Sequence, residues 1–294
     1  AGTIRNTRGR IHRLRSHLKD LRPDVVISFF ADINVLTALA CKPLHVPLIL
    51  SERNHPVFHR IPRRWSLARR FFYRYADRLV VQTEQSLPHY EGLGVKVSVI
   101  PNLLRDPQPV HDGTARWILG VGRLTPQKGF DLLLKAYARS GLYPGWHLII
   151  MGEGEEREHL TSLAVRLGVE DRVSFPGLAR EIDHYYRRAS LFVLSSRYEG
   201  FPNALSEAMA AGLPCVSFDC EFGPSLMIKP QENGLLVPPE DVDALGQSLA
   251  RMGHHPELRN QYGQKAKKDI ASLLNRDRIM NKWEELIEGV MRNR

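Results

Sequence analysis

The chain has 294 residues, of which 43% are hydrophobic, and a formal net charge of +9. This length and hydrophobic content allow a sizeable core, most simply divided between two domains. No stretch approaches the ~20 consecutive apolar residues of a membrane-spanning helix. Three cysteines without CxxC or metal-ligand spacing predict core thiols in a reducing cytosol. The positive charge predicts an anionic partner: phosphate groups, nucleic acid or an anionic membrane surface.

The first segment, residues 4–21, has the spacing of an amphipathic helix with one apolar face and a separate basic stripe. The basic stripe is either an ordinary solvated face or a contact for phosphorylated lipids at a membrane surface. The apolar face consists of Ile11, Leu14, Leu18 and Leu21, and the basic stripe of Arg8, His12, Arg15 and Lys19.

A second basic helix is expected between residues 61 and 79, where apolar residues recur with 4-3-4-3-4 spacing and include Trp65 and Phe72. Such a stripe usually packs into a core. The density of arginines favours a second interpretation, in which exposed tryptophan and arginine contact a lipid headgroup layer. The arginines assigned to this membrane contact are Arg63, Arg64, Arg70 and Arg74.

Short apolar runs alternate with helical segments in the first hundred residues, which predicts a parallel, doubly wound sheet. Ligands of such sheets bind beyond the carboxyl ends of the strands. The polar segment Ser51–Pro56 follows one predicted strand and is therefore a candidate rim of a cleft, with His55 as a candidate catalytic residue. A lone loop histidine is more often merely exposed. The predicted strands are residues 24–30, 46–51, 79–83 and 97–100.

A polar segment with three prolines, residues 101–113, is predicted to link two domains. After it the alternation restarts and forms a complete α/β unit. The first unit is short by comparison, because it has no opening strand with a glycine-rich loop. We therefore expect a partial first domain (1–104), a linker (105–116), a second domain (117–275) and a C-terminal helix (276–294) that packs back on the first domain.

One strand–turn–helix element in the second domain is suited to bind an anion. The apolar run Leu191–Leu194 leads into a Gly/Pro turn and a helix of small residues, with Glu199 and Glu207 on either side of the turn. The helix N-terminus presents unpaired N–H groups and a positive dipole end, where a phosphate fits. Arg123 and Lys128 follow the first strand of the same domain and face the same crevice. Together they predict a diphosphate clamp, whereas for each cation alone a surface salt bridge is the simpler interpretation.

These motifs resemble the retaining glycosyltransferases of family 4, which have the GT-B fold. The resemblance covers residues from about 22 to 290. The motifs that carry it are Arg123 with Lys128-Gly129, Glu199 with Glu207, Asn233–Pro239, Pro101-Asn102, Met151–Gly154 and Phe175–Gly177. Three further segments resemble bacterial members that build surface polysaccharide or lipid-linked oligosaccharide from UDP-hexoses or N-acetylhexosamines. These segments are Val26–Phe29, Ser51–Asn54 and Phe222–Pro224.

The resemblance implies two doubly wound, Rossmann-like parallel-sheet domains that face a cleft, the first of them incomplete, and a reaction that retains the anomeric configuration. It implies that Arg123 and Lys128 hold the donor diphosphate. Glu207 would bind the ribose hydroxyls, and Glu199 would contact the transferred sugar, so that Glu199, Arg123 and Lys128 form the catalytic set. The other implied donor-binding residues are Gly122, Phe201, Pro202, Asn203, Ala204 and Leu205, with Leu178 near the nucleobase.

The sequence departs from the family pattern in three places. The opening strand and its glycine-rich loop are missing, so the chain is expected to begin inside the first domain. The family histidine usually ends a strand directly, whereas Ser51–Asn54 precede His55 here; Asn54 and His55 are possible acceptor-side residues. After Phe222–Pro224 relatives often carry a glutamate, where this chain has Leu226 or its neighbours.

No metal and no cofactor are expected besides the nucleotide-sugar co-substrate. The only Asp-x-Asp sequence, Asp241–Asp243, follows two prolines and Glu240. This context predicts a helix N-cap with acidic residues in the first turn rather than a metal site.

The sequence therefore predicts a peripheral glycosyltransferase at the cytoplasmic face of the cell membrane. It would move a hexose or N-acetylhexosamine from a nucleotide sugar, with UDP as the expected nucleotide, to a lipid-linked or polysaccharide acceptor. The alternatives are a GT-B epimerase or phosphorylase, and a non-catalytic donor-binding fragment. A nucleic-acid binder is disfavoured, because the aromatic stripe from Trp65 to Tyr75 is helical rather than a base-stacking sheet surface.

Overall fold

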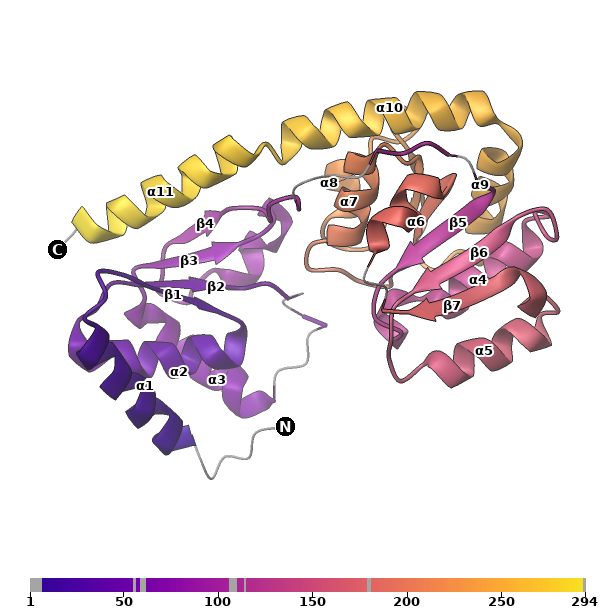
Figure 1. Cartoon of the computed structure of the whole chain (residues 1–294). Coiled ribbons are helices and arrows are strands. Elements are labelled where there is room, and N and C mark those ends of the chain that lie inside the picture. Colours follow the sequence, from indigo (N-terminus) through magenta and orange to yellow (C-terminus); the bar gives the residue numbers. More distant parts are fainter. Residues whose placement is uncertain are drawn as a thin grey trace. The chain divides into compact units, whose positions relative to one another are not determined.

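The internal contacts of the chain divide it into two α/β units, each built on one parallel sheet (Figure 1). Unit 1 comprises Ala1–Asn102 with Arg276–Arg294, and unit 2 comprises Leu103–Asn275. The predicted class, two parallel-sheet α/β domains, is confirmed. The computed structural model describes residues 7–54, 57–58, 62–105, 110–113, 115–178 and 181–292.

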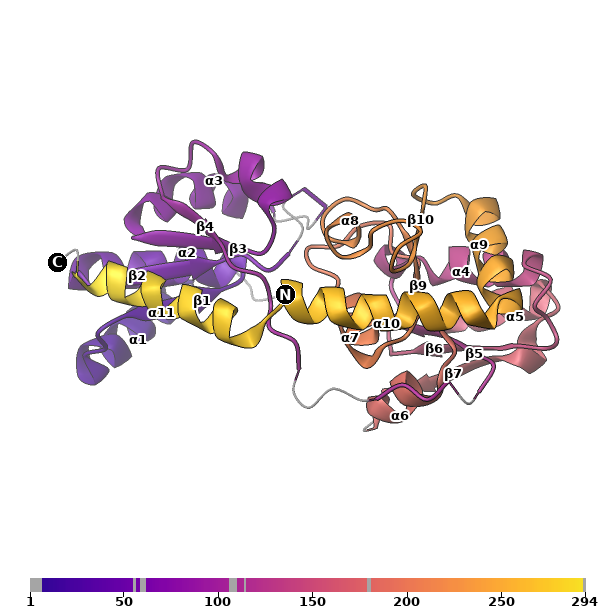
Figure 2. The same ribbon diagram turned by 90° about the horizontal axis from the view of Figure 1, so that it is seen from above.

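The described part of unit 1 has a four-stranded sheet in the order β1-β2-β3-β4, so spatial order follows chain order. Right-handed crossovers in such a sheet return on one face, where α2 packs against α1 and α3. Helix α11 lies along the opposite face (Figures 1 and 2). The strands are β1 (Val26–Phe29), β2 (Leu48–Ser51), β3 (Arg78–Val81) and β4 (Val97–Val99). The helices are α1 (Thr7–Leu21), α2 (Ala31–Cys41), α3 (Arg63–Phe72) and α11 (Arg276–Arg292).

Helix α1 packs on α2 through the apolar face that its spacing predicts. Leu18 is buried, and Ile11 and Leu14 pack against the same core. The basic stripe was predicted to face solvent or a membrane surface, but the side chain of Arg15 points to the protein instead. Its Nη2 donates to the carbonyl oxygen of Leu39 on α2 at 2.9 Å. Arg15 therefore attaches α1 to the unit, and the other three residues of the basic stripe, Arg8, His12 and Lys19, are exposed.

Helix α3 is shorter than the sequence predicts, and its exposed face is not the predicted one. It ends at Phe72, and the chain becomes extended at Ala76 (φ −89°, ψ 148°) before β3. The apolar spacing continues past this point only because strand residues coincide with the helical period. Trp65 packs against the core rather than facing solvent. The exposed apolar residues are instead Leu67 (59%) and Phe71 (49%).

Unit 2 has a six-stranded parallel sheet in its described residues, in the order β10-β9-β8-β5-β6-β7. Helix α4 packs against α5 and α9 on one face, and α7 packs against α6 and α10 on the other. The strands are β5 (Trp117–Val121), β6 (His147–Met151), β7 (Val173–Gly177), β8 (Leu191–Leu194), β9 (Cys215–Phe218) and β10 (Leu235–Val237). The helices are α4 (Phe130–Arg139), α5 (Arg157–Arg166), α6 (Ile182–Arg188), α7 (Asn203–Ala211), α8 (Pro224–Met227), α9 (Val242–His254) and α10 (Pro256–Leu273).

The strand order of unit 2 fixes where a ligand binds. Connections run outward in both directions from the adjacent strands β5 and β8. At such a switch point the loops that leave the two strands diverge to opposite faces, which opens a crevice beyond the carboxyl ends. The two loops here are those that contain Lys128 and Glu199. In the described part of the chain no helix combines the length and apolar character that crossing a bilayer requires.

The three cysteines are reduced and buried, as expected of core thiols. Burial is the main cause that raises the pKa of the Cys220 thiol to about 12.

Candidate active site

Two loops meet at the switch point of unit 2, one after β5 and one after β8. The hydroxyl of Ser195 donates to the carbonyl oxygen of Lys128 at 2.9 Å. Gly129 lies directly against this contact with φ 61°, and a Cβ there would be 2.0 Å from the carbonyl oxygen of Ser195. Only glycine allows this approach, so the local sequence Lys128-Gly129 brings the lysine to the end of β8.

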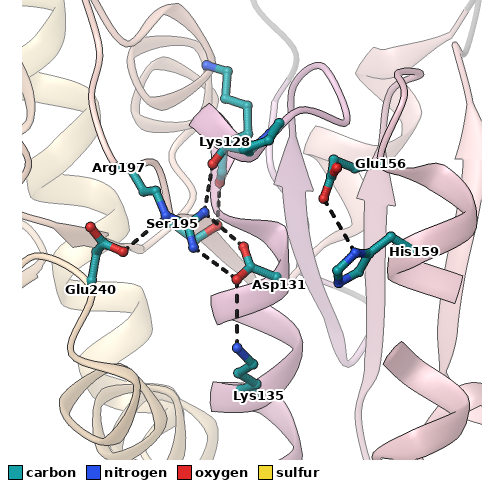
Figure 3. A network of polar contacts seen from close by, with 9 residues as sticks. Lys128, Asp131, Lys135, Glu156, His159, Ser195, Arg197 and Glu240 are labelled. Atoms are coloured by element: carbon teal, nitrogen blue, oxygen red, sulfur yellow. Dashed lines mark hydrogen bonds and ion pairs between the residues drawn. The ribbon is translucent and has the colours of Figure 1, made fainter. Parts of the chain in front are cut away.

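A network of salt bridges connects the loop after β8 to helix α4, which follows the loop after β5, and to Glu240 (Figure 3). Arg197 donates from Nη1 and Nη2 to the two carboxylate oxygens of Asp131, each at 2.9 Å, and from Nε to Glu240 at 3.0 Å. Burial opposes ionisation of Asp131, but the guanidinium outweighs it and the pKa of Asp131 is lowered. A bidentate pair of this kind fixes orientation as well as distance. The backbone N–H of Arg197 also donates to the carbonyl of Gln127 at 2.8 Å.

Lys128 and Glu199 form an ion pair between the two loops. The Nζ of Lys128 lies 2.6 Å from Oε1 of Glu199, and the hydroxyl of Ser196 donates to the same oxygen at 2.7 Å. Both charged side chains are largely buried. A Cβ at Gly122 would lie 3.0 Å from Cε of Lys128, so a glycine there leaves room for the lysine side chain. The structure thus brings together two residues 71 positions apart; Ser196 was not identified from the sequence.

Arg123 and the N-terminus of α7 add further positive charge to unit 2. Arg123 is exposed, and none of the described carboxylates forms an ion pair with it. Helix α7 begins after the buried Pro202 without a side-chain cap. Within the described residues, the backbone N–H groups of Ala204 and Leu205 have no acceptor. Such groups at a dipole end favour an anion. Phe201 is buried, Asn203 is exposed, and Leu178 at the end of β7 is 81% exposed.

Glu207 lies in the second turn of α7, where a buried tyrosine orients it. The hydroxyl of Tyr186 on α6 donates to Oε2 of Glu207 at 3.0 Å. Burial, first of all, raises the pKa of Glu207, while this hydrogen bond and the charge of Arg105 oppose the shift. No described residue pairs with Oε1 of Glu207, which leaves that oxygen to accept from a ligand. Tyr186 was missed from the sequence, because two adjacent tyrosines in a short helix do not show which of them is buried beside a carboxylate.

The carboxyl edge of the unit 1 sheet contains a buried carboxylate that the sequence did not identify either. Glu52 follows β2 directly and is 4% exposed. It accepts from the hydroxyl of Tyr73, and Nη1 of Arg69 lies 3.8 Å from the same oxygen. Burial, first of all, raises the pKa of Glu52 despite these two partners. A charged residue immediately after a largely apolar strand is the signal that could have identified it.

Three other buried polar atoms gather at this edge of unit 1 without a partner among the described residues: Oδ1 of Asn34, Oγ of Ser51 and Oγ1 of Thr83. Unsatisfied buried groups cost about 1–3 kcal/mol each and are rare except at functional sites. Next to them Phe30 has a φ of 71°, a strained value for a non-glycine residue. Asn54, which follows Ser51 by three positions, is half-buried. His55 lies outside the described residues.

Asp241 has the role that its sequence context predicts. Its Oδ1 accepts from the backbone N–H groups of Asp243 at 3.1 Å and Ala244 at 2.9 Å, which makes it the N-cap of α9. Among the described residues, no three His, Cys, Asp or Glu side chains are grouped in a way that could hold a metal ion.

A doubly wound sheet with a lysine, an arginine that pairs with none of the described carboxylates and an uncapped helix at its switch point is an arrangement suited to a phosphorylated ligand. Family models specify the class further. Residues 105–269 match the glycosyl transferases group 1 model, and residues 4–103 match the glycosyl transferase 4-like domain model. The chain belongs to the glycosyl transferases group 1 family and is a glycosyltransferase.

Individual relatives agree with this assignment. The chain is 31% identical over 286 residues to a glycosyltransferase of Haemophilus influenzae. The match covers 94% of this chain and 79% of that relative. It is 28% identical over 283 residues to the GalNAc-α-(1->4)-GalNAc-α-(1->3)-diNAcBac-PP-undecaprenol α-1,4-N-acetyl-D-galactosaminyltransferase of Campylobacter jejuni, covering 94% of this chain and 78% of that one.

The fold is shared with HepE of Anabaena, whose structure was determined in complex with UDP and glucose. The TM-score is 0.86 at 18% identity, and the match covers 95% of this chain and 81% of HepE. The predicted GT-B fold and the predicted enzyme class are therefore confirmed.

Proposed function

We propose that this glycosyltransferase moves a hexose or N-acetylhexosamine from a UDP-sugar to a lipid-linked or saccharide acceptor, with retention of anomeric configuration. The observation that carries the proposal is the Lys128–Glu199 pair at the switch point of unit 2. HepE, which binds UDP and glucose, supports the choice of donor. The Campylobacter relative, named for an undecaprenol-diphosphate-linked saccharide, supports the choice of acceptor.

The proposed roles follow from where charge develops during glycosyl transfer. The sugar passes through an oxocarbenium-like state while negative charge grows on the departing phosphate. Cations fixed in advance stabilise such charge most effectively. Lys128, held by Glu199, and Arg123 would bind the diphosphate together with the N–H groups of Ala204 and Leu205. No metal and no cofactor enter this proposal.

The two glutamates of unit 2 would have different roles. Glu199 pairs with Lys128 through Oε1, and its second carboxylate oxygen would accept from a hydroxyl of the transferred sugar. Glu207, with Oε2 held by Tyr186, presents Oε1 to the ribose hydroxyls.

We assign the acceptor to the carboxyl edge of the unit 1 sheet. Exposed aromatic rings, Phe29 (40%) and Phe30 (50%), lie at the end of β1. Glu52 and the unpartnered buried oxygens of Asn34 and Ser51 lie near the ends of the adjacent strand. Apolar ring faces beside hydrogen-bonding oxygens suit a saccharide, which has both apolar and hydroxyl surfaces. Asn54 and His55 stay predictions for the same rim.

A panel of nucleotide sugars tests the donor assignment. We expect UDP-sugars to raise the melting temperature of the protein and to yield a sugar transferred to a lipid-linked acceptor, detected by mass spectrometry. ADP- or GDP-sugars giving the larger shift would reject UDP as the nucleotide. An epimerised nucleotide sugar without acceptor product would replace the proposal with the epimerase alternative.

Attachment to the membrane is proposed for α3 of unit 1. Its exposed Leu67 and Phe71 lie one turn apart, and Arg64 and Arg70 are exposed on the same helix. Apolar side chains among arginines suit an anionic bilayer surface, to which each basic residue adds about 1 kcal/mol. We therefore propose a peripheral protein at the cytoplasmic membrane face.

Neutralising both arginines tests this surface. Arg64→Gln with Arg70→Gln should weaken sedimentation with phosphatidylserine vesicles about 30-fold, since about 2 kcal/mol is lost. Arg8→Gln with Lys19→Gln on α1 serves as the matched control, and a larger loss there would move the contact to α1.

A further inference from the structure

Unit 2 contains a second polar cavity at the opposite edge of its sheet from the proposed donor site. Its volume is about 520 Å³, within the range of small-molecule sites. One wall is Val110–Gly113, the segment that leads into the unit, and another includes Ser190, which precedes β8. This cavity lies at the amino end of β8, whereas the proposed donor site lies at its carboxyl end. The length of the strand separates the two sites, so they do not overlap.

The third wall is one face of α10, where Pro256 is followed by side chains that all can donate hydrogen bonds. Asn260, Gln264 and Lys267 line the cavity at i, i+4 and i+7 spacing. This stripe of α10 contains no acidic and no large apolar residue. Lys267 is exposed, and no described residue forms an ion pair or hydrogen bond with its ammonium group.

Further positive charge converges on the cavity from Arg259 and His111. Arg259 donates from Nη1 to the carbonyl oxygens of Met252 and Gly253, at 2.6 and 3.0 Å, and its guanidinium lies over the ring of Trp146. Glu257 attracts it electrostatically, but none of the described carboxylates forms an ion pair with it. Burial, first of all, lowers the pKa of His111, and the charges of Arg259 and Lys267 lower it further. An interaction with the backbone of Arg187 and the charge of Asp112, which also lines the cavity, oppose this shift.

An arrangement of like charges in a concave site is unfavourable until a counter-ion binds. In addition, Nδ1 of His111 is buried without a partner among the described residues. A multivalent anion would relieve the repulsion between Arg259 and Lys267. It would also favour the imidazolium form of His111, which could then donate from both ring nitrogens.

We propose that this cavity binds a small phosphorylated ligand, with the phosphate held by Arg259, Lys267 and His111. Because Val110–Gly113 forms one wall, a bound ligand would also hold this segment in place. The segment is otherwise attached by backbone bonds, from His111 N–H to Ala211 at 3.1 Å and from Asp112 N–H to Arg187 at 2.9 Å, and by the hydroxyl of Ser190, which donates to the carbonyl oxygen of Gly113 at 3.2 Å. The site is therefore placed to stabilise the connection between unit 2 and the preceding chain.

Isothermal titration with inorganic pyrophosphate and with UDP tests the proposal on the full chain. Lys267→Glu reverses the charge of an exposed side chain on the cavity wall, and should weaken pyrophosphate binding at this site about tenfold or more. Lys268→Glu, the adjacent exposed residue outside the cavity, is the matched control and should bind as wild type. Gln264→Lys adds a cation to the same stripe and should tighten binding.

Hydrogen exchange locates the ligand independently of the proposed donor site. Pyrophosphate should protect Val110–Gly113 in wild type and not in Lys267→Glu. Protection confined to the loops around Lys128 and Glu199, or equal affinity in all three variants, would overturn the proposal. Pyrophosphate protection of Val110–Gly113 without such protection by UDP would define a site for phosphate groups alone; the same protection by UDP would define a nucleotide diphosphate site.

Discussion

The carboxyl edges of the two sheets differ in how far their buried polar groups are paired. In unit 2, Lys128, Glu199 and Ser196 satisfy one another within 2.6–2.7 Å, and Tyr186 holds one oxygen of Glu207, while Oγ1 of Thr125 alone of the described side-chain atoms at this edge is buried without a partner. In unit 1, three buried oxygens, those of Asn34, Ser51 and Thr83, have no partner among the described residues. Burial also raises the pKa of Glu52 at this edge.

This difference indicates that the polar groups of the two edges are oriented to different extents before a ligand binds. The unit 2 edge is preorganised, so a charged ligand meets groups whose orientation is already fixed. The unit 1 edge keeps unsatisfied polar groups at a cost in stability, which is the pattern expected where a ligand completes the hydrogen bonding. Changes at the first edge should therefore affect catalysis most, and changes at the second should affect stability.

The largest effect is expected for Lys128→Ala. The substitution removes the cation that would meet the departing diphosphate, so kcat should fall by about 100-fold or more. Lys135→Ala is the matched control, because Lys135 is a half-exposed lysine on α4 that pairs with Asp131 at 3.8 Å (Figure 3). Steady-state kinetics with a UDP-sugar measure both. Wild-type turnover in Lys128→Ala would reject the assigned site.

Substitutions at Glu207 and Tyr186 separate binding from positioning. Glu207→Ala should weaken UDP binding about tenfold or more, since a charged hydrogen-bond acceptor is lost. Tyr186→Phe removes only the group that orients Glu207, and should raise KM by a smaller factor with kcat nearly unchanged. Tyr185→Phe, on the same helix, is the control. A Tyr186→Phe protein with unchanged KM would show that Glu207 needs no orientation.

Much of unit 2 can be read from its sequence, because buried parallel strands appear as short continuous apolar runs. Leu191–Leu194 and His147–Met151 are examples of strands that the sequence locates well. The proximity of Lys128 and Glu199 also follows, since both loops leave adjacent strands at a switch point. The long helix α10 and the short strand β10 were not predicted; β10 has only 3 residues and a brief apolar run carries little signal.

Features that depend on tertiary environment could not be read in the same way. Arg15 looks like part of a basic stripe, but its bond to the Leu39 carbonyl depends on how α1 packs on α2. The helical period suggested that α3 continues past Phe72, although the chain turns into β3. Tyr186 and Glu52 each matter because of burial beside one partner, which no local spacing reveals.

The buried carboxylate of unit 1 should make stability depend on pH. Because the pKa of Glu52 is raised, the folded protein retains a proton that the unfolded chain releases. The free energy of unfolding should therefore fall as pH rises from the ordinary glutamate pKa to the raised one, and stay lower above it. Glu52→Gln should flatten this fall and be the more stable protein at neutral pH. Urea unfolding from pH 4 to 8 measures both, and parallel curves would contradict the expectation.

The smallest effect comes from the same substitution at both edges. Ser196→Ala removes a hydroxyl that donates to Glu199, and should lower the free energy of unfolding by about 1 kcal/mol. Ser51→Ala removes a buried hydroxyl that has no partner in the described chain, so its free energy of unfolding should stay equal or rise. If a saccharide completes the unit 1 edge, Ser51→Ala should instead weaken acceptor binding. Equal destabilisation by both substitutions, measured by urea unfolding without ligands, would show that the two edges are satisfied alike.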